Sequence, residues 1–242
     1  MIKNIFFDLD GTMLPMDMKK FMKLYFSSMA EAVCPYIEMS PETLRKALLG
    51  GMEAMYQNQG AMSNKMCFWN KVATMVGPEI INDIPMFNGY YENEFILTKE
   101  ATTVNPYSRK IVDEVRRKGY NTVMATNPFF PKIATERRVK WAGLDKNDFS
   151  VITTYENSKY CKPNPKYFIE TCEMAKCKPE ETLMVGNDVR EDMISATIGM
   201  ETFLVTDDLI NRDNVDISGY KQGSLKDFYE YCLQLPDLTE EQ

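Results

Sequence analysis

The chain contains no histidine in its 242 residues. Without histidine, the protein cannot use a Ser-His-Asp triad, a Cys-His protease dyad or phosphohistidine transfer, and it cannot bind zinc or iron through imidazole. Any chemistry at its sites must therefore use carboxylates, lysine, hydroxyl groups or a hard cation.

Long apolar runs and basic blocks are absent as well. No segment approaches the roughly 18 uninterrupted apolar residues of a membrane span, and the net charge is -7 with no block of five or more basic residues. We therefore expect neither a membrane nor a nucleic acid as partner, since nucleic-acid binding needs a surface of lysine and arginine. The N-terminus reaches Asp8 too early to hold the apolar region of a signal peptide.

The six cysteines show no CxxC pair and no framework spacing. Scattered thiols in a chain of this length are typical of reduced, mostly buried residues, which favours a cytoplasmic location. Cys161 precedes Lys162, a candidate site residue described below. We expect Cys161 to be an unreactive buried thiol, with a redox-active thiol as the alternative.

The hydrophobic pattern divides the chain into two kinds of region. Residues 2–7 are an apolar run, which predicts a buried strand that ends at a glycine turn. From about residue 16 to residue 101 the spacing is helical only, with a helix start at Ser40-Pro41 and another at Ser63. Beyond Asn105-Pro106, strands and helices alternate to the end of the chain, and the pattern includes a strand near residues 149–153 and a helix over residues 188–198. The pattern predicts a parallel α/β sheet, covered on both faces, with a helical insert after its first strand.

Polar residues follow several of the predicted strands, where open parallel sheets bind their ligands. They are Asp8 and Asp10 after the first strand, Thr126 and Asn127 after the strand 121–126, and Asn187 and Asp188 after the strand 182–186. Lys162 lies in a loop before a helix, and Asp192 lies one helical turn beyond Asp188. We expect these groups to share one pocket.

A pocket with several carboxylates and one lysine requires another cation. Two like charges about 4 Å apart repel by roughly 4 kcal/mol at an effective dielectric constant near 20. The carboxylates would therefore be unstable together, or would become protonated. A divalent cation offsets this repulsion, and an all-oxygen site with few protein ligands suits Mg²⁺.

The chain resembles the haloacid dehalogenase-like hydrolase superfamily, because four of its motifs occur here in order. They are Asp8-Leu9-Asp10-Gly11-Thr12, Thr126 after an apolar strand, Lys162-Pro163-Asn164-Pro165, and Gly186-Asn187-Asp188 followed by Asp192. The resemblance covers essentially the whole chain. It implies a Rossmann-like doubly wound core from residues 1–15 and 102–242, and an all-helical cap domain of the C1 type from residues 16–101.

The resemblance also implies roles for the motif residues. Asp8 would be the nucleophile that forms an aspartyl-phosphate, and Asp10 would be the general acid and base. Thr126 and Asn127 would bind the phosphoryl oxygens, and Lys162 would hold the nucleophile and the phosphate by its charge. Lys159 and Lys166 are the alternatives for this role. The proline next to Lys162 favours Lys162.

The implied metal site uses the same motifs. Asp8, the backbone carbonyl of Asp10, and Asp188 would ligate Mg²⁺. Asp192 would orient a ligand water or Lys162, and it could also be an ordinary carboxylate of a helix first turn. Asn187 departs from the family pattern, because many members have an aspartate there. The division of the metal role between Asp188 and Asp192 therefore stays open.

The helical insert offers weaker signals. Its methionine and aromatic stripes predict the core of the insert, and a substrate surface is the alternative. The loop of residues 56–65 is a candidate for substrate selection, with Asn58, Asn64 and Lys65 as possible contacts.

These observations predict a magnesium-dependent phosphatase that acts on small phosphorylated metabolites as a monomer or homodimer. An aspartate at the position of Asp10 favours phosphate over halide chemistry, because the family's dehalogenases lack it. A phosphomutase of the same fold and a non-catalytic binding protein are the alternatives.

Overall fold

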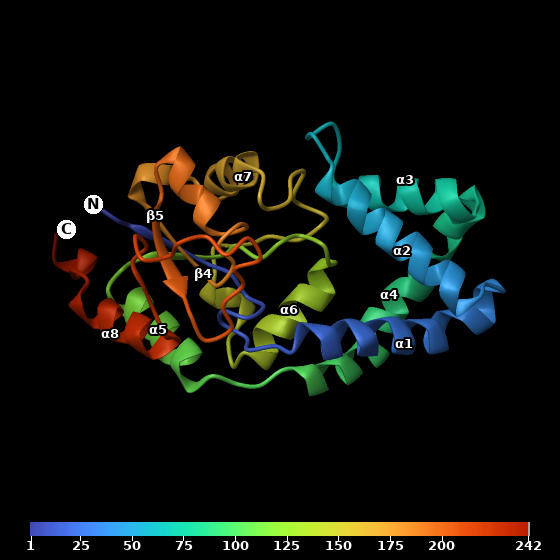
Figure 1. Cartoon of the computed structure of the whole chain (residues 1–242), viewed down its shortest axis with the longest axis horizontal. Coiled ribbons are helices and arrows are strands. Elements are labelled where there is room, and N and C mark those ends of the chain that lie inside the picture. The colour runs from blue at the N-terminus through green and yellow to red at the C-terminus, as the bar shows by residue number, and fades with distance from the viewer. Residues whose placement is uncertain (242) are drawn as a thin grey trace.

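One six-stranded sheet, in the order β3-β2-β1-β4-β5-β6, lies at the centre of the computed structural model, which describes residues 1–241. Every neighbouring pair of strands is parallel, and Figure 1 shows the sheet at one end of the molecule. The strands are β1 (Asn4–Phe7), β2 (Asn121–Met124), β3 (Val151–Ile152), β4 (Thr182–Gly186), β5 (Glu201–Val205) and β6 (Gln222–Gly223). The predicted α/β fold with a parallel sheet is confirmed.

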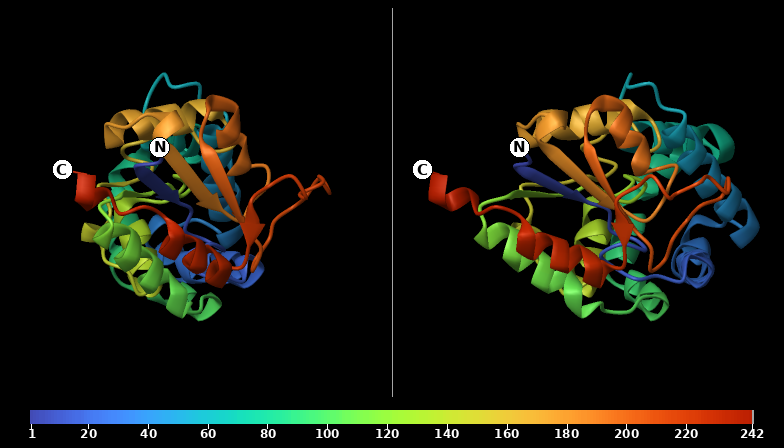
Figure 2. Two further views of the ribbon diagram at one scale, coloured as in Figure 1. Left: turned by 90° about the vertical axis from the view of Figure 1, so that its left-hand side faces the viewer. Right: turned by 60° about the vertical axis from the view of Figure 1, so that its left-hand side comes forward.

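Helices cover both faces of the sheet (Figure 2). On one face lie α5 (Pro106–Arg117) and α8 (Leu225–Gln234), which pack against each other, and α6 (Lys132–Trp141) follows β2. On the other face lie α7 (Pro165–Ala175) and the 3₁₀ helix η5 (Met193–Ile198). Alternate residues of β1 face the two layers, since Phe7 contacts Phe228 of α8 while Phe6 clusters with Tyr167 and Phe168 of α7. Short 3₁₀ turns also occur at Lys146–Asp148, Pro179–Glu181 and Leu238–Glu241.

The chain between β1 and α5 forms helices only, as the sequence predicts. They are α1 (Met18–Ile37), α2 (Pro41–Tyr56), α3 (Asn64–Val76), η1 (Pro78–Asp83), α4 (Ile84–Glu92) and η2 (Glu94–Ala101). Ser40 and Ser63 accept hydrogen bonds from backbone N–H groups of the first turns of α2 and α3, so both predicted helix starts are confirmed. No helix among residues 1–241 is long and apolar enough to cross a membrane.

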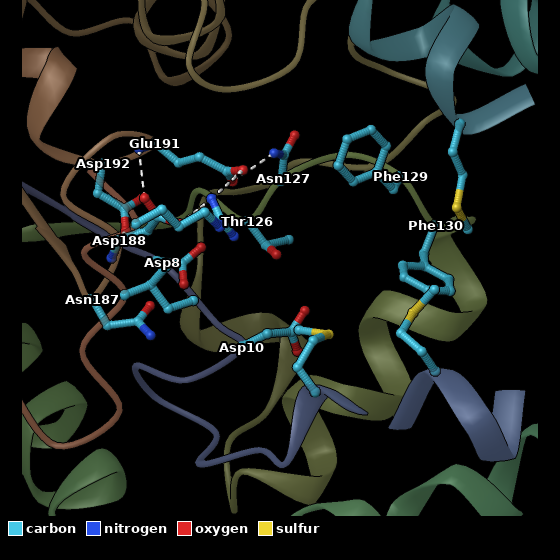
Figure 3. Close-up of a pocket in the computed structure, with 15 residues that line it drawn as sticks. Asp8, Asp10, Thr126, Asn127, Phe129, Phe130, Asn187, Asp188, Glu191 and Asp192 are labelled. Atoms are coloured by element: carbon cyan, nitrogen blue, oxygen red, sulfur yellow. Dashed lines mark hydrogen bonds and ion pairs between the residues drawn. The ribbon is translucent and has the colours of Figure 1, made fainter. Parts of the chain in front are cut away.

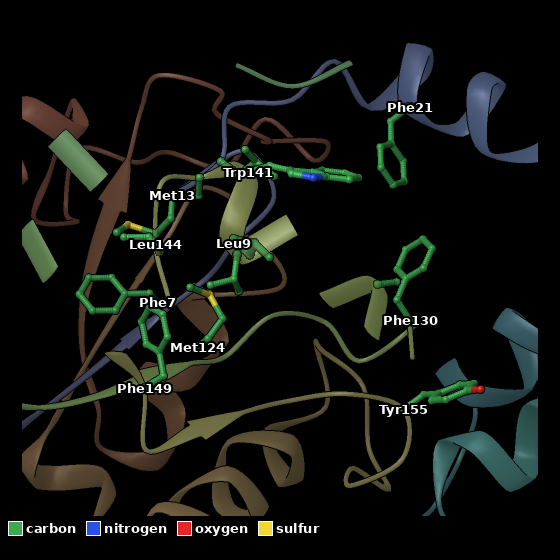
Figure 4. Packing of buried hydrophobic residues seen from close by; sticks show 14 of the residues in the cluster. Phe7, Leu9, Met13, Phe21, Met124, Phe130, Trp141, Leu144, Phe149 and Tyr155 are labelled. Atoms are coloured by element: carbon green, nitrogen blue, oxygen red, sulfur yellow. The ribbon is translucent and has the colours of Figure 1, made fainter. Parts of the chain in front are cut away.

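The two segments that connect these helices with the sheet lie side by side. Met16 pairs with Thr102 in an antiparallel bridge, and the Thr103 N–H donates to the Pro15 carbonyl at 3.1 Å. Aromatic residues continue the packing across this boundary, because Phe21 of α1 meets Phe130, which follows β2, with ring centroids 6.0 Å apart (Figure 4). The domain boundaries at residues 15–16 and 101–102 stay predictions.

The predicted helix over residues 188–198 is wrong in its first half. Both the Arg190 and the Glu191 N–H groups donate to the Asp188 carboxylate, so this segment is a turn, and only η5 is helical. The predicted strand at 149–153 is shorter than expected, and β6 was not predicted, because a two-residue strand leaves no periodic pattern.

Candidate active site

The carboxyl ends of β1, β2 and β4 meet at one cavity of about 290 Å³ (Figure 3). Seven of the predicted site residues line it, namely Asp8, Asp10, Thr126, Asn127, Asn187, Asp188 and Asp192. The expectation that the strand ends converge is therefore correct in its geometry, and Lys162 reaches the same place from behind the cavity wall.

Lys162 joins two of the carboxylates. Its Nζ lies 2.9 Å from Asp8 Oδ1 and 2.6 Å from Asp192 Oδ1, and the side chains of Lys162 and Asp192 are each only 1% exposed. Burial acts to lower the pKa of Lys162, but the charges of Asp192 and Asp8 outweigh it and hold the pKa well above its ordinary value. The lysine therefore stays charged, and it is Lys162, not Lys159 or Lys166, that contacts the carboxylates.

The glycine turn after β1 places Asp8 against the Asn187 segment. Thr12 Oγ1 lies 3.2 Å from Asp8 Oδ2 and 3.0 Å from Asn187 Oδ1. Gly11 has a φ of +83°, and a Cβ at this position would collide with the Asn187 amide, so only glycine fits here. Asn187 Nδ2 donates to the Asp208 carbonyl at 2.6 Å. An aspartate could not make this last bond, which gives Asn187 a structural reason to depart from the family pattern.

Asp188 and Asp192 differ in what remains available to a cation. Asp192 Oδ2 accepts the Asp188 N–H at 3.0 Å and its Oδ1 contacts Lys162, so both oxygens are engaged. Asp188 Oδ1 accepts two N–H groups of its own turn, and its Oδ2 contacts only the half-exposed Arg212, at 3.0 Å. Asp188 therefore keeps a carboxylate oxygen whose contact is a half-exposed arginine, whereas both oxygens of Asp192 contact buried groups. The division of the metal role between them stays a prediction.

Asp10 has a partner that the sequence analysis missed. Arg138 of α6 forms an ion pair with Asp10 Oδ2, its side chain is 1% exposed, and its guanidinium lies 4.6 Å from the centroid of the Phe130 ring. Asp10 Oδ1 is buried without a hydrogen-bond partner. Burial raises the pKa of Asp10, and Arg138 opposes that rise. A signal existed, because Arg138 shares the buried face of α6 with Ala134 and Trp141, where an unpaired charge would be costly.

Glu191 is a second residue that was missed. Its Oε2 accepts a hydrogen bond from Asn127 Nδ2 at 2.8 Å, and burial raises its pKa. Asn127 Oδ1 is buried without a partner. Figure 3 shows this pair at the rim of the carboxylate cluster.

The three predicted contacts from the loop of residues 56–65 do not line the cavity. Asn58 Nδ2 donates to Asn64 Oδ1 at 3.0 Å, Asn64 Nδ2 lies 3.4 Å from Cys161 Sγ, and the Lys65 ammonium lies over the Tyr155 ring. The Lys65 N–H also donates to the Tyr155 carbonyl at 2.7 Å. The prediction that these three residues contact the substrate is corrected, because the loop packs against the segment before Lys162 and its polar groups form hydrogen bonds there.

The thiol next to Lys162 is not exposed for reaction. Cys161 is buried, and burial raises its pKa well above the ordinary value, so the reactive thiolate is disfavoured. All six cysteines are free. The structure therefore agrees with the expectation of an unreactive buried thiol at this position.

The donor set fits Mg²⁺ better than a metal that needs a protein cage. Among residues 1–241 no group of three or more histidine, cysteine or acidic side chains is arranged to enclose a metal ion. Around the cavity, however, five carboxylates meet three cationic side chains, Lys162, Arg138 and Arg212. An excess of carboxylate oxygens with room for water and phosphate ligands is the environment that Mg²⁺ prefers.

A family model decides where the chain belongs. The model described as haloacid dehalogenase-like hydrolase matches residues 2–197. The chain belongs to this family. As a haloacid dehalogenase-like hydrolase it is an enzyme, so the predictions of family and of a hydrolase are confirmed.

Its relatives within the family are distant. A glyceraldehyde 3-phosphate phosphatase of Methanothermobacter thermautotrophicus is 25% identical over 230 residues, which cover 90% of this chain and 93% of the relative. Pyrophosphatase PpaX of Bacillus mycoides is 25% identical over 213 residues, covering 85% of this chain and 84% of that protein. Among solved structures, a HAD phosphatase from Thermococcus onnurineus covers 98% of this chain and is itself covered completely, with a TM-score of 0.59 at 19% identity. That last likeness concerns the fold.

Proposed function

We propose that this hydrolase is a magnesium-dependent phosphatase of small phosphorylated metabolites, which acts through an aspartyl-phosphate on Asp8. The observation that supports this most strongly is the contact of Lys162 with both Asp8 and Asp192 at the closed end of the cavity. A buried lysine there orients one oxygen of Asp8 and supplies positive charge where a phosphoryl group would enter. The names of the two relatives agree with a phosphatase.

In the first step the Asp8 carboxylate attacks phosphorus. A bond forms between an Asp8 oxygen and phosphorus, the bond to the leaving oxygen breaks, and Asp10 gives that oxygen a proton. The raised pKa of Asp10 favours a protonated carboxyl for this task. Thr126 and Asn127, which line the cavity beside Asp8, are placed to contact the phosphoryl oxygens.

In the second step water attacks the phosphorus of the aspartyl-phosphate. Asp10 now accepts a proton from the water, the bond between phosphorus and the Asp8 oxygen breaks, and phosphate leaves. Thr12 and Lys162 remain in contact with the Asp8 carboxylate. They return it to the geometry that the first step needs.

Asp8, the backbone carbonyl of Asp10, and Asp188 would hold Mg²⁺. The cation would neutralise charge on the phosphoryl group and on the carboxylates around it. Asp192 would act on Lys162, because both of its oxygens are engaged. This assignment divides the acidic residues into two that bind the metal by their carboxylates and one that positions the lysine.

Residues 16–101 are proposed as a cap domain over a core formed by residues 1–15 and 102–242. The two connecting segments pair at Met16 and Thr102, so they are placed to act together as a hinge. Closure over the cavity would exclude water during phosphoryl transfer and would restrict the size of the substrate.

The test is phosphate release from p-nitrophenyl phosphate, measured with Mg²⁺ and with a chelator. We expect turnover that requires Mg²⁺ in the wild type and in Asp113→Asn, a change on the solvent side of α5, and none in Asp8→Asn. An Asp8→Asn protein as active as the wild type would overturn the assignment of the nucleophile.

A further inference from the structure

The cavity has two chemically different walls. The carboxylates occupy one wall, and Figure 3 shows Phe129 and Phe130 on the opposite side. The apolar residues that line the cavity come from four separate segments: Met18 and Met22 of α1, Met52 of α2, Phe129 and Phe130 after β2, and Ile210 after β5. Because the apolar lining is contributed by both the helical insert and the sheet domain, it encloses the space where the leaving group of a substrate would lie.

Two polar side chains of the cavity lining each contact a partner within the protein. Arg212 contacts Asp188 at 3.0 Å, and Glu191 accepts from Asn127 at 2.8 Å. Among the described residues that line the cavity, only Asp10 Oδ1 and Asn127 Oδ1 are buried without a hydrogen-bond partner. Both belong to residues proposed to contact the phosphoryl group or the leaving oxygen, and the methionine, phenylalanine and isoleucine side chains of the apolar wall offer no strong hydrogen-bond partner to a leaving group with several hydroxyls.

We infer that the substrate is the phosphate monoester of a compact alcohol that is apolar or aromatic. This inference rests on the proposed phosphatase function and names the class of leaving group that the same site prefers. A cavity of about 290 Å³ must hold the phosphoryl group as well, which limits the alcohol to a small one. Methionine side chains adapt to different apolar shapes, so the site would accept several members of this class.

Two other classes fit the cavity less well. A sugar phosphate would bring hydroxyl groups against methionine and phenylalanine, where they lose their hydrogen bonds to water. Pyrophosphate would place a second anionic group beside the apolar wall, and Arg212 is the one cationic side chain among the described residues that line the cavity. The leaving group thus differs in kind from those that the names of the two relatives describe.

The first experiment compares three probes on the wild-type enzyme with Mg²⁺, namely n-pentyl phosphate, glycerol 1-phosphate and pyrophosphate. The two esters match in size and both release a primary alcohol, so they differ mainly in polarity. One methylene in an apolar pocket is worth about 10-fold to 200-fold in discrimination. We therefore expect kcat/KM for pentyl phosphate to exceed the values for the other two by at least about 10-fold.

The second experiment tests the wall itself with Met22→Gln and Met52→Gln, which keep the length of the side chain and add polarity. Each should raise KM for pentyl phosphate and reduce the preference over glycerol 1-phosphate, measured as the ratio of the two kcat/KM values, by roughly 10-fold. Met66→Gln is the matched control, because Met66 lies on α3 outside the cavity and is 54% exposed; its preference should equal that of the wild type.

The outcomes separate the two proposals. If glycerol 1-phosphate or pyrophosphate is the better substrate, the inferred leaving group is wrong while the phosphatase function stands. An unchanged preference for pentyl phosphate over glycerol 1-phosphate in both Met22→Gln and Met52→Gln would also overturn the inferred leaving group. If none of the three probes nor p-nitrophenyl phosphate releases phosphate, the proposed function fails, and the inference about its substrate fails with it.

Discussion

The buried guanidinium of Arg138 donates to the carboxylate of Asp10 across the boundary between α6 and the turn after β1. The pair lies 128 residues apart in sequence, and the Arg138 guanidinium also lies over the Phe130 ring. Because arginine stays charged and presents a planar donor group, it restricts the rotation of the Asp10 side chain. Arg138 is thus a positioning residue for the proposed general acid.

Replacing Arg138 should affect the step that needs a proton. We expect Arg138→Met to lower kcat for an alkyl phosphate by about 100-fold, since general acid catalysis contributes about 10²–10⁴-fold, and to change kcat for p-nitrophenyl phosphate much less. The nitrophenolate leaves without protonation, whereas an alkoxide does not. Arg138→Lys should recover part of the loss, and Arg137→Met, next to it on α6, is the control. Equal losses on both substrates would show that Arg138 acts only on the fold.

The Lys162–Asp192 pair predicts a non-additive pair of mutations. Lys162→Met leaves Asp192 buried without its counter-charge, and breaking a buried pair in this way costs about 3–5 kcal/mol of unfolding free energy. The double variant Lys162→Met/Asp192→Asn should be more stable than Lys162→Met alone, because the unpaired charge is gone. Urea unfolding at neutral pH measures both. Activity should be absent in both, and additive losses of stability would contradict the pairing.

Magnesium affinity should distinguish the two acidic residues that follow β4. Titration calorimetry with Mg²⁺ should show a larger loss of affinity in Asp188→Asn than in Asp192→Asn, because Asp192 has both oxygens engaged within the protein. Arg212→Gln should bind Mg²⁺ more tightly than the wild type, since Arg212 contacts the same Asp188 oxygen. The reverse order of the two aspartates would assign the metal to Asp192.

The contact of Asp148 with Arg109 and Arg116 predicts a stability that depends on pH. Burial acts to raise the pKa of Asp148, but Arg109, the backbone N–H of Asp145 and Arg116 together outweigh it and hold the pKa below its ordinary value. A lowered pKa stabilises the folded state above the unfolded pKa of about 4, and this contribution is lost as the pH falls through the folded value.

Asp148→Asn should therefore cost about 1–2 kcal/mol at pH 7, a figure reduced for the solvent exposure of both arginines. At about pH 3 the variant and the wild type should differ less. Thermal unfolding across this range is the measurement. Asp113→Asn serves as control, because Asp113 contacts Arg109 from an exposed position. If the difference in stability between Asp148→Asn and the wild type does not change with pH, the charge of Asp148 is not its cause.

The convergence of Asp8, Asp188 and Lys162 could be predicted from the sequence, because the ligand-binding residues of a parallel sheet lie at the carboxyl ends of its strands and in the loops that follow them. Their positions in the chain mattered little, since the parallel sheet brings all strand ends to one edge. The roles of these residues stay predictions, while the family and the fold class are confirmed.

The partner of Arg138 and the contacts of the loop of residues 56–65 could not be predicted, for a common reason. Both depend on how one element is rotated against another, and helical periodicity gives the buried face of α6 without saying which carboxylate it meets. Asn58 and Asn64 looked like substrate contacts because they are polar residues in a loop, yet they bond to each other and to the segment before Lys162. Loop direction depends on such tertiary contacts, which leave no local pattern in the sequence.

The central place of β1 determines when the enzyme can first become active during its synthesis. Asn4 pairs with Asn121 of β2 on one side and with Thr182 of β4 on the other, so β1, which Asp8 directly follows, is made before both of its neighbours. Contacts between distant segments form slowly, and an unpaired apolar strand is prone to aggregate. The nascent chain must therefore carry β1 with one edge unpaired until β4 leaves the ribosome, and a chain that ends before this point would have Asp8 without the residues that follow β4.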